Sequence, residues 1–312
     1  MFKKLSGIHH ITAIVGHPQE NVDFYAGVLG LRLVKQTVNF DDPGTYHLYF
    51  GDDKGTPGTI ITFFPWADAK QGVIGDGQVG VTTYVVPEGA FSFWKRRLEK
   101  YNVPYTETKR FGETYLQFDD PHGLHLEIVA RAEGERNGWM FGEITREVAI
   151  KGFGGATLFS ADKDKTTHLL EKGMGLEFIG QEGDYLRYRS MAEIGNIIDL
   201  KVKSSGKGTM GVGTVHHIAW RATDDHDQLE WSKRMTDRGY FVTKVRDRKY
   251  FNSIYFNEHG GILFEIATDP PGFAHDESQE TMGEKLMLPE QYEQYREQLE
   301  QKLIPIEVRE LD

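Results

Sequence analysis

Residues 213–220 read GTVHHIAW, a short run of strand-forming residues with adjacent histidines at positions 216 and 217. Neighbouring side chains of a strand face opposite ways, so one histidine of the pair points into whatever the strand encloses. The same phrase occurs near the start of the chain, where residues 7–12 read GIHHIT, and residues 261–267 (GILFEIA) carry Glu265 among apolar neighbours. Two histidines and one carboxylate are the ligands of an Fe(II)-type facial triad. The repeated phrase therefore indicates an internal repeat and a candidate metal site.

The repeat extends through the whole chain as four segments that follow one plan. Each segment opens with a strand, continues through a helix that ends near Gly or Asn, and closes with alternating strands, the last of which follows a Gly turn. The segments run from Gly7 to Phe64, from Gly80 to Val129, from Gly152 to Leu200 and from His216 to Ala267. We therefore predict an α+β fold of four βαβββ modules, each about 45 to 55 residues long.

The length of 312 residues is enough for about two domains of 100 to 200 residues each. We expect a first half at 6–131, which holds modules one and two, and a second half at 147–268, which holds modules three and four. Residues 269–312 depart from the repeat and are expected to form a C-terminal loop and a helix from about Pro289 to Lys302. This tail is expected to cap a domain or to form an oligomer contact.

Composition narrows the classes of function. Cysteine is absent, which excludes disulfides, thiolate nucleophiles and cysteine-based metal sites. The formal net charge of −11 repels phosphate backbones and anionic lipids, so we do not expect a nucleic-acid or membrane partner. No apolar run approaches the roughly 18 to 20 residues of a membrane helix, and the basic N-terminus lacks the apolar region of a signal peptide. We expect a cytoplasmic protein that acts on small molecules.

The repeat also allows equivalent positions to be compared within the one chain. On the opening strands, the equivalents of His217 are His10 and Gly155, with Gly or Val in the second module. On the closing strands, the equivalents of Glu265 are Thr62, Glu127 and Asp199. Modules one and four therefore hold the histidines, whereas modules two and three hold carboxylates without them.

This distribution predicts which modules pair. If modules one and four close into one half-open barrel and modules two and three into another, His10, His217 and Glu265 meet in one cavity, with Thr62 at the fourth place. Pairing one with two and three with four would separate the histidines. Three protein ligands with open positions are typical of a catalytic metal site rather than a structural one. The alternative is that each histidine is an ordinary hydrogen-bonded core residue.

Several stretches resemble a known family: HHIT at 9–12, HHIAW at 216–220 and GGILFEIATDPPGF at 260–273. With the four modules, they resemble the vicinal oxygen chelate superfamily, also called glyoxalase/bleomycin-resistance/dioxygenase. Within it, the chain looks like the hydroquinone-type ring-cleaving dioxygenases at YHLYFGD (46–52), DPPGFAHDE (269–277) and GEKLMLP (283–289). The resemblance implies Fe(II), with Mn(II) as an alternative, held by His10, His217 and Glu265. It also implies the nested module pairing.

The resemblance further implies pocket roles for His9, Thr12, His216, Arg248 and Tyr255. By strand alternation His9 and His216 face away from the metal unless a bulge brings them to the cavity rim. Thr12 lies on the same face as His10 and can bond a substrate oxygen, although a packing role fits its spacing equally. Tyr255 could donate its hydroxyl to a bound phenolate.

Some positions keep a structural alternative. Arg110 stands as far before Glu127 as Arg248 does before Glu265, so a salt bridge common to both modules is an alternative role for Arg248. Tyr49 occupies the place in module one that Tyr255 occupies in module four, and His47 near it is a weaker candidate for ligand or acid–base work. The carboxylates that stand without histidines are expected to be surface or salt-bridged groups: Glu127 and Asp199.

The resemblance implies an extradiol-type dioxygenase that opens hydroquinone or catechol rings with O2, in aromatic-compound degradation or detoxification. A glyoxalase-like isomerase is one alternative, although such enzymes use four protein ligands and Thr62 removes the fourth here. A thiol transferase is another, although these are two-module chains. A metal-free binding protein on the same fold is the third, and a metal assay would separate it from the enzymes.

Overall fold

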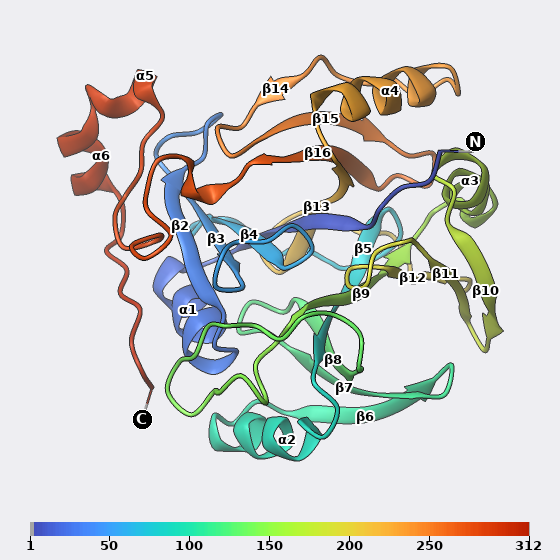
Figure 1. Ribbon diagram of the computed structural model, residues 1–312, viewed down its shortest axis with the longest axis horizontal. Coiled ribbons are helices and arrows are strands. Elements are labelled where there is room, and N and C mark those ends of the chain that lie inside the picture. Colours follow the sequence, from blue (N-terminus) through green and yellow to red (C-terminus); the bar gives the residue numbers. More distant parts are fainter. Residues whose placement is uncertain (1–2, 312) are drawn as a thin grey trace.

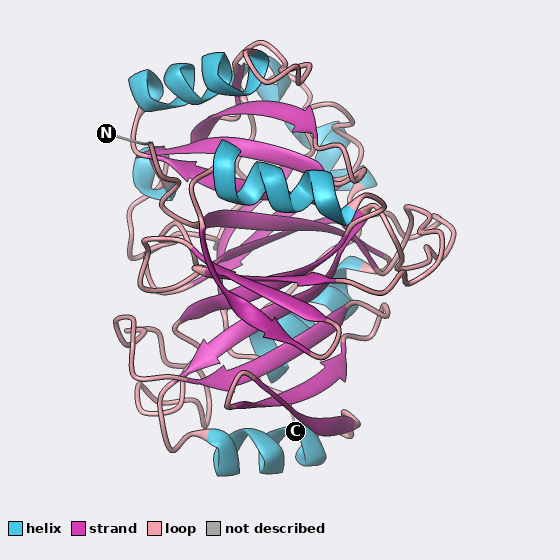
Figure 2. Cartoon of the chain, turned by 90° about the vertical axis from the view of Figure 1, so that its right-hand side faces the viewer, coloured by secondary structure: helices cyan, strands magenta, loops and turns pink. Residues whose placement is uncertain are grey.

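The computed structural model describes residues 3–311, which form two curled eight-stranded sheets. The helices lie on the outside of the sheets, as Figure 1 and Figure 2 show. Within residues 3–311, every helix is too short or too polar to span a membrane.

Each of the four modules has the predicted βαβββ order. Module one contains β1 (Ile8–Val15), α1 (Pro18–Val22), η1 (Asp23–Val28), β2 (Arg32–Val38), β3 (Tyr46–Gly51) and β4 (Ile60–Pro65). Module two contains β5 (Gln78–Val86), α2 (Phe91–Lys100), β6 (Tyr105–Arg110), β7 (Glu113–Asp119) and β8 (His125–Ala130). Module three contains β9 (Gly152–Phe159), α3 (Lys163–His168), η2 (Leu169–Gly173), β10 (Glu177–Glu182), β11 (Tyr185–Arg189) and β12 (Ile197–Lys201). Module four contains β13 (Thr214–Ala222), α4 (Asp225–Thr236), β14 (Arg246–Asp247), β15 (Phe251–Asn257) and β16 (Leu263–Pro271).

The modules pair in the nested way. The first sheet has the order β14-β15-β16-β13-β1-β4-β3-β2, so it joins module four to module one through the antiparallel pair β1 and β13. The second sheet has the order β10-β11-β12-β9-β5-β8-β7-β6 and joins module three to module two through β5 and β9. The predicted fold and pairing are confirmed.

The helices follow the sequence signals with one variation. In α4 the Asp224 side chain accepts the backbone N–H of Asp227 and so caps the N-terminus. Gln228, Trp231 and Met235 are buried, and their spacing of three and four residues puts them on one face. In modules one and three the predicted helix continues as a π-helical turn, η1 and η2. A π-helical turn has wider hydrogen bonding than an α-helix, and the spacing of apolar residues along a whole helix does not reveal this difference.

The C-terminal tail differs from the single helix expected over 289–302. It forms the short 3₁₀ helix η3 (Phe273–His275) and two short helices, α5 (Glu290–Glu293) and α6 (Arg296–Lys302). The break coincides with bonds to module one and to the tail itself: the Tyr292 hydroxyl donates to the Phe40 carbonyl at 3.0 Å, and Arg296 donates to the Leu286 carbonyl at 3.0 Å. Figure 1 shows the tail running down beside module one to the C-terminus. The tail therefore caps module one.

Candidate metal centre

Three potential metal ligands meet in the first sheet: His10 on β1, His217 on β13 and Glu265 on β16. All three side chains are buried. Glu265 Oε2 lies 2.8 Å from His217 Nε2 and 3.3 Å from His10 Nε2, and the two Nε2 atoms lie 3.3 Å apart. The three atoms thus form a compact triangle contributed by three neighbouring strands.

The triangle fits a divalent cation. Ligands about 2.1 Å from a metal and at right angles to one another lie about 3 Å apart, which matches the observed separations. Glu265 Oε2 is buried, and its near neighbours among residues 3–311 are the Nε2 atoms of the two histidines, which carry no proton to donate when they act as metal ligands. Buried carboxylate oxygens are normally bonded. A cation bound to this oxygen would satisfy it.

The other oxygen of Glu265 is held by Ser253, whose hydroxyl donates a short hydrogen bond to Glu265 Oε1. Sequence analysis did not identify Ser253. The spacing could have indicated it, because Ser253 lies two residues before Tyr255 on β15 and strand alternation puts both side chains on the same face of the strand. The bond fixes the carboxylate so that Oε2 points to the two histidines.

His9 lies behind His10 and not in the cavity wall. Its Nδ1 atom is 2.9 Å from His10 Nδ1, and its Nε2 atom is 3.2 Å from the Thr268 carbonyl oxygen. The carbonyl can only accept, so His9 Nε2 carries a proton; because burial lowers the pKa of His9 well below its ordinary value, the ring is neutral and its Nδ1 accepts from His10. In a neutral His10 ring, donation through Nδ1 leaves Nε2 without a proton, as a metal ligand requires. The family resemblance implies a pocket role for His9, whereas strand alternation turns it away from the metal. Its observed position suits the orientation of His10.

His216 stands in the corresponding relation to His217, with a separation of 2.8 Å between the two Nδ1 atoms. Unlike His9, it lines the cavity. Burial, followed by the neighbouring His217, lowers the pKa of His216 to about 3, so its ring is neutral. If His217 Nδ1 donates to His216, the Nε2–H of His216 remains free to donate to a ligand.

A cavity of about 280 Å³ opens beside the triangle. This volume is near the lower limit of about 300 Å³ for small-molecule pockets, so it suits a compact ligand. Thr12, Arg248 and Tyr255 also line it, as predicted for pocket residues. Its aromatic wall also includes Phe40, Tyr49, Phe64, Trp66 and Phe251. The cavity can therefore hold a single-ring compound against the triangle.

Arg248 and Tyr255 form a linked pair at the cavity. Arg248 Nε donates to the Tyr255 hydroxyl oxygen at 3.1 Å, and both Nη atoms lie 3.4 Å from Asp41 Oδ2. Burial, followed by Glu265, raises the pKa of Tyr255 above its ordinary value, so the hydroxyl keeps its proton at neutral pH. Because the Tyr255 oxygen already accepts from Arg248, its proton can be donated to a ligand or to the Ser253 hydroxyl, with which Tyr255 also interacts.

The corresponding arginine of the second sheet is held in buried salt bridges. Arg110 makes a bidentate pair with Glu127, at 3.0 and 2.6 Å, and also bonds Asp199 at 2.7 Å. Arg187 bonds Asp199 as well. These carboxylates are buried, so the surface alternative for Glu127 and Asp199 is wrong and the salt-bridge alternative is confirmed. Arg248 has no such bond to Glu265 and differs from Arg110 in its partners.

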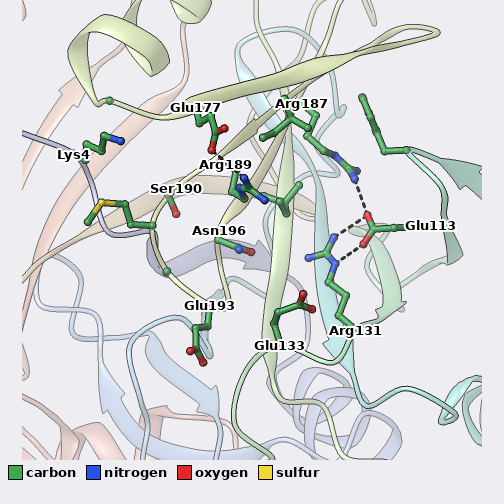
Figure 3. A pocket seen from close by; sticks show the side chains of 16 residues that line it. Lys4, Glu113, Arg131, Glu133, Glu177, Arg187, Arg189, Ser190, Glu193 and Asn196 are labelled. Carbon is green, nitrogen blue, oxygen red and sulfur yellow. Dashed lines mark hydrogen bonds and ion pairs between the residues drawn. The ribbon is translucent and has the colours of Figure 1, made fainter.

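The second sheet also has the larger cavity, of about 630 Å³. Figure 3 shows charged side chains around it, with Glu113 bonded to both Arg131 and Arg187. Among residues 3–311, the one cluster with the histidine and carboxylate atoms to hold a metal is that of the first sheet. The larger cavity therefore lacks the ligand set found beside the smaller one.

A comparison with known families agrees with this architecture. The model of the Glyoxalase/Bleomycin resistance protein/Dioxygenase superfamily matches residues 7–128 and 152–266. The chain therefore belongs to that superfamily, and the predicted family is confirmed. Enzymes of the superfamily typically bind a divalent metal, and the His10, His217 and Glu265 cluster is the candidate site here.

Individual relatives narrow the comparison. The chain is 74% identical over 312 residues, all of both chains, to MhqO of Bacillus subtilis (strain 168), which is provisionally named a ring-cleaving dioxygenase. It is 34% identical to a chlorohydroquinone/hydroquinone 1,2-dioxygenase of Sphingobium indicum, over 95% of each chain. A solved structure of a dioxygenase, provisionally so named, from Bacillus subtilis superposes with a TM-score of 0.98, over 99% of this chain and 100% of the other, at 74% identity. Glyoxalase I from Zea mays, at 12% identity, has a TM-score of 0.63 over 84% and 92% of the chains and shares the fold alone.

Proposed function

We propose that this chain is a non-haem, Fe(II)-dependent dioxygenase that cleaves hydroquinone-type or catechol-type rings with O2. The observation that carries the proposal is the buried triangle of His10, His217 and Glu265 beside a small cavity with aromatic walls. The names of two relatives that match nearly the whole chain support the same reaction. We place the reaction in the cytoplasm, with a small aromatic compound and O2 as the partners.

The donor set of two imidazoles and one carboxylate suits Fe(II), with Mn(II) as the second choice. When bound there, the metal would supply open positions for a phenolate and for O2 and a path for electrons between them. The chain's own residues do the rest. Ser253 orients Glu265, and His9 orients His10 through its Nδ1 proton.

The cavity residues bind and orient the ring. The free proton of Tyr255 would be donated to a phenolate oxygen, while Arg248 keeps the Tyr255 hydroxyl in place. His216 would donate its Nε2 proton to a ligand oxygen on the other side. Hydrogen-bond donors fixed before the ligand arrives stabilise negative charge that develops on oxygen during the reaction. We propose cleavage of the extradiol type, in which the broken bond lies beside a hydroxylated ring carbon and one phenolate oxygen lies against the triangle.

The arrangement disfavours a four-ligand isomerase. Thr62 occupies the fourth place, and its hydroxyl already bonds Thr12 and His47, each at 2.8 Å. A thiol transferase and a metal-free binding protein remain as alternatives. Measurement of metal binding and of O2 uptake separates both from a dioxygenase.

The test is anaerobic reconstitution with Fe(II), followed by O2 uptake with hydroquinone, methylhydroquinone and catechol. Ring-cleaving activity should appear only with Fe(II) or Mn(II) and should be lost in Glu265→Gln, which keeps the size of the side chain but removes its charge. Thr37→Val is the matched control, because Thr37 is buried in the same sheet outside the cavity. A reconstituted protein that binds metal but consumes no O2 with any of the three rings contradicts the proposal.

A further inference from the structure

We propose that Tyr49, His47 and Thr62 form a directed hydrogen-bond chain that holds the hydroxyl of Thr12 as a donor into the cavity. The inference rests on the proposed function only in taking a ligand oxygen as the acceptor. His47 and Tyr49 line the same cavity as Thr12, and their hydroxyl and ring nitrogens are bonded to one another and to Thr62. In this proposal His47, Tyr49 and Thr62 are positioning residues, which act on the ligand through Thr12.

The hydrogen-bond chain consists of three consecutive contacts of equal length. Tyr49 Oη lies 2.8 Å from His47 Nδ1, His47 Nε2 lies 2.8 Å from Thr62 Oγ1, and Thr62 Oγ1 lies 2.8 Å from Thr12 Oγ1. The strand register brings the groups together, because Thr12 is opposite Thr62 on β4 and Thr62 is opposite Tyr49 on β3. His47 precedes Tyr49 by two residues and therefore lies on the same face.

The direction of the chain follows from the donors and acceptors. Within residues 3–311, the Tyr49 hydroxyl has no partner other than His47, and the Tyr49 ring is buried. A buried hydroxyl proton is normally bonded, so Tyr49 donates to His47 Nδ1. A neutral imidazole that accepts at Nδ1 carries its proton on Nε2, so His47 donates to Thr62. The proton of Thr62 then goes to Thr12.

Thr12 is left with its own proton free. Among the described residues its hydroxyl contacts only Thr62, and the residue lines the cavity two positions after His10. No acceptor among the described residues remains for its proton, which can therefore be donated to a ligand in the cavity. Burial lowers the pKa of His47 well below its ordinary value, which is consistent with a neutral link in the chain. The Tyr49 ring is packed against Phe273, with centroids 5.1 Å apart, so the starting point of the chain is fixed.

This arrangement gives Thr62 a role that differs from that of a lost metal ligand. A hydroxyl can accept one hydrogen bond and donate another, whereas valine at the same place can do neither. Thr62→Val should free the hydroxyl of Thr12 to turn either way, and Thr62→Ser should keep the chain intact.

The first measurement is the tautomer of His47, read from ¹⁵N chemical shifts in the full-length protein labelled at histidine. The wild type should show Nε2 protonated and Nδ1 unprotonated at neutral pH, and Tyr49→Phe should weaken that preference. A His47 that is protonated at Nδ1 in the wild type would overturn the proposed direction.

The second measurement uses 4-nitrophenol, which absorbs visible light only as the phenolate, bound under argon to the Fe(II)-loaded protein. Loss of a hydrogen bond to the charged oxygen should raise the apparent pKa of the bound phenol by about one unit in Thr62→Val, a roughly tenfold change. Thr62→Ser should restore the wild-type value. Thr37→Val, the same substitution at a buried position opposite His47, should leave it unchanged.

An unchanged pKa in Thr62→Val, or a Thr62→Ser value no closer to wild type, would overturn the inference. Neither measurement depends on turnover. A wild-type protein that consumes no O2 would therefore contradict the proposed function while leaving the His47 tautomer and the nitrophenol shift to decide this inference separately.

Discussion

Replacing Tyr255 with phenylalanine is expected to slow ring cleavage without disturbing the fold. The substitution keeps the ring, which packs edge-on against His217 with centroids 5.8 Å apart, and removes only the hydroxyl. That hydroxyl accepts a hydrogen bond from Arg248 and keeps a proton for the ligand. The variant therefore isolates one polar contact to the substrate.

The size of the effect follows from the charge on the acceptor. A hydrogen bond to a charged group contributes about 1.5 to 3 kcal/mol, and each 1.36 kcal/mol is about tenfold in rate, so kcat/KM should fall by roughly ten- to a hundredfold or slightly more. Arg248 still has Asp41 at 3.4 Å, so its guanidinium is not left without a partner. Metal content and thermal stability should change little.

The assay is O2 uptake by the Fe(II)-loaded variant with methylhydroquinone over a range of concentrations. Tyr188→Phe is the matched control, since it deletes a buried tyrosine's hydroxyl, bonded to Thr167 at 3.0 Å, in the second sheet. If kcat/KM of Tyr255→Phe stays within about threefold of wild type while stability falls, Tyr255 is a packing residue and the reasoning is refuted.

Three further predictions concern the two sheets. Arg110→Met should lower the free energy of unfolding by about 3 to 5 kcal/mol, because it leaves Glu127 and Asp199 buried without Arg110; urea unfolding measures this, and an unchanged midpoint would contradict it. Partial burial by itself would raise the pKa of Glu113. Arg131 and Arg187 outweigh this effect and hold the pKa of Glu113 at about 2. Glu113 therefore stabilises the protein above its unfolded pKa of about 4.5, and the stability gap to Glu113→Gln should close as pH falls through about 2; a gap that widens in acid would refute the sign. His217→Ala should remain folded by circular dichroism but lose bound metal, and normal iron content in that variant would remove His217 from the ligand set.

The sequence predicted the fold because the candidate metal ligands lie at equivalent positions of an internal repeat, and their distribution indicates which modules pair. His10 and His217 recur at equivalent strand positions, and only the nested pairing puts them in one cavity with Glu265, which is the arrangement observed. The division of the chain into halves at 6–131 and 147–268 stays a prediction. So does the formation of an oligomer.

Other features depend on contacts that no local pattern encodes. Nothing near Thr62 in sequence indicates that its hydroxyl links Thr12 to His47, because the three lie on different strands. The burial of Asp199 likewise depends on Arg110, which lies 89 residues away in the chain. The break between α5 and α6 coincides with bonds to residues outside both helices. Side-chain alternation identifies the face of a strand, and tertiary pairing decides what that face meets.

The most direct test of the metal centre is an anomalous-difference map at the iron absorption edge, from crystals of the protein reconstituted anaerobically with Fe(II). We predict one peak, in the first sheet, with His10 Nε2, His217 Nε2 and Glu265 Oε2 as its three protein ligands at about 2.0 to 2.2 Å. No peak should occur beside Glu127 and Asp199. A map without a peak at the His10, His217 and Glu265 triangle, or with the iron bound elsewhere, would contradict the assignment.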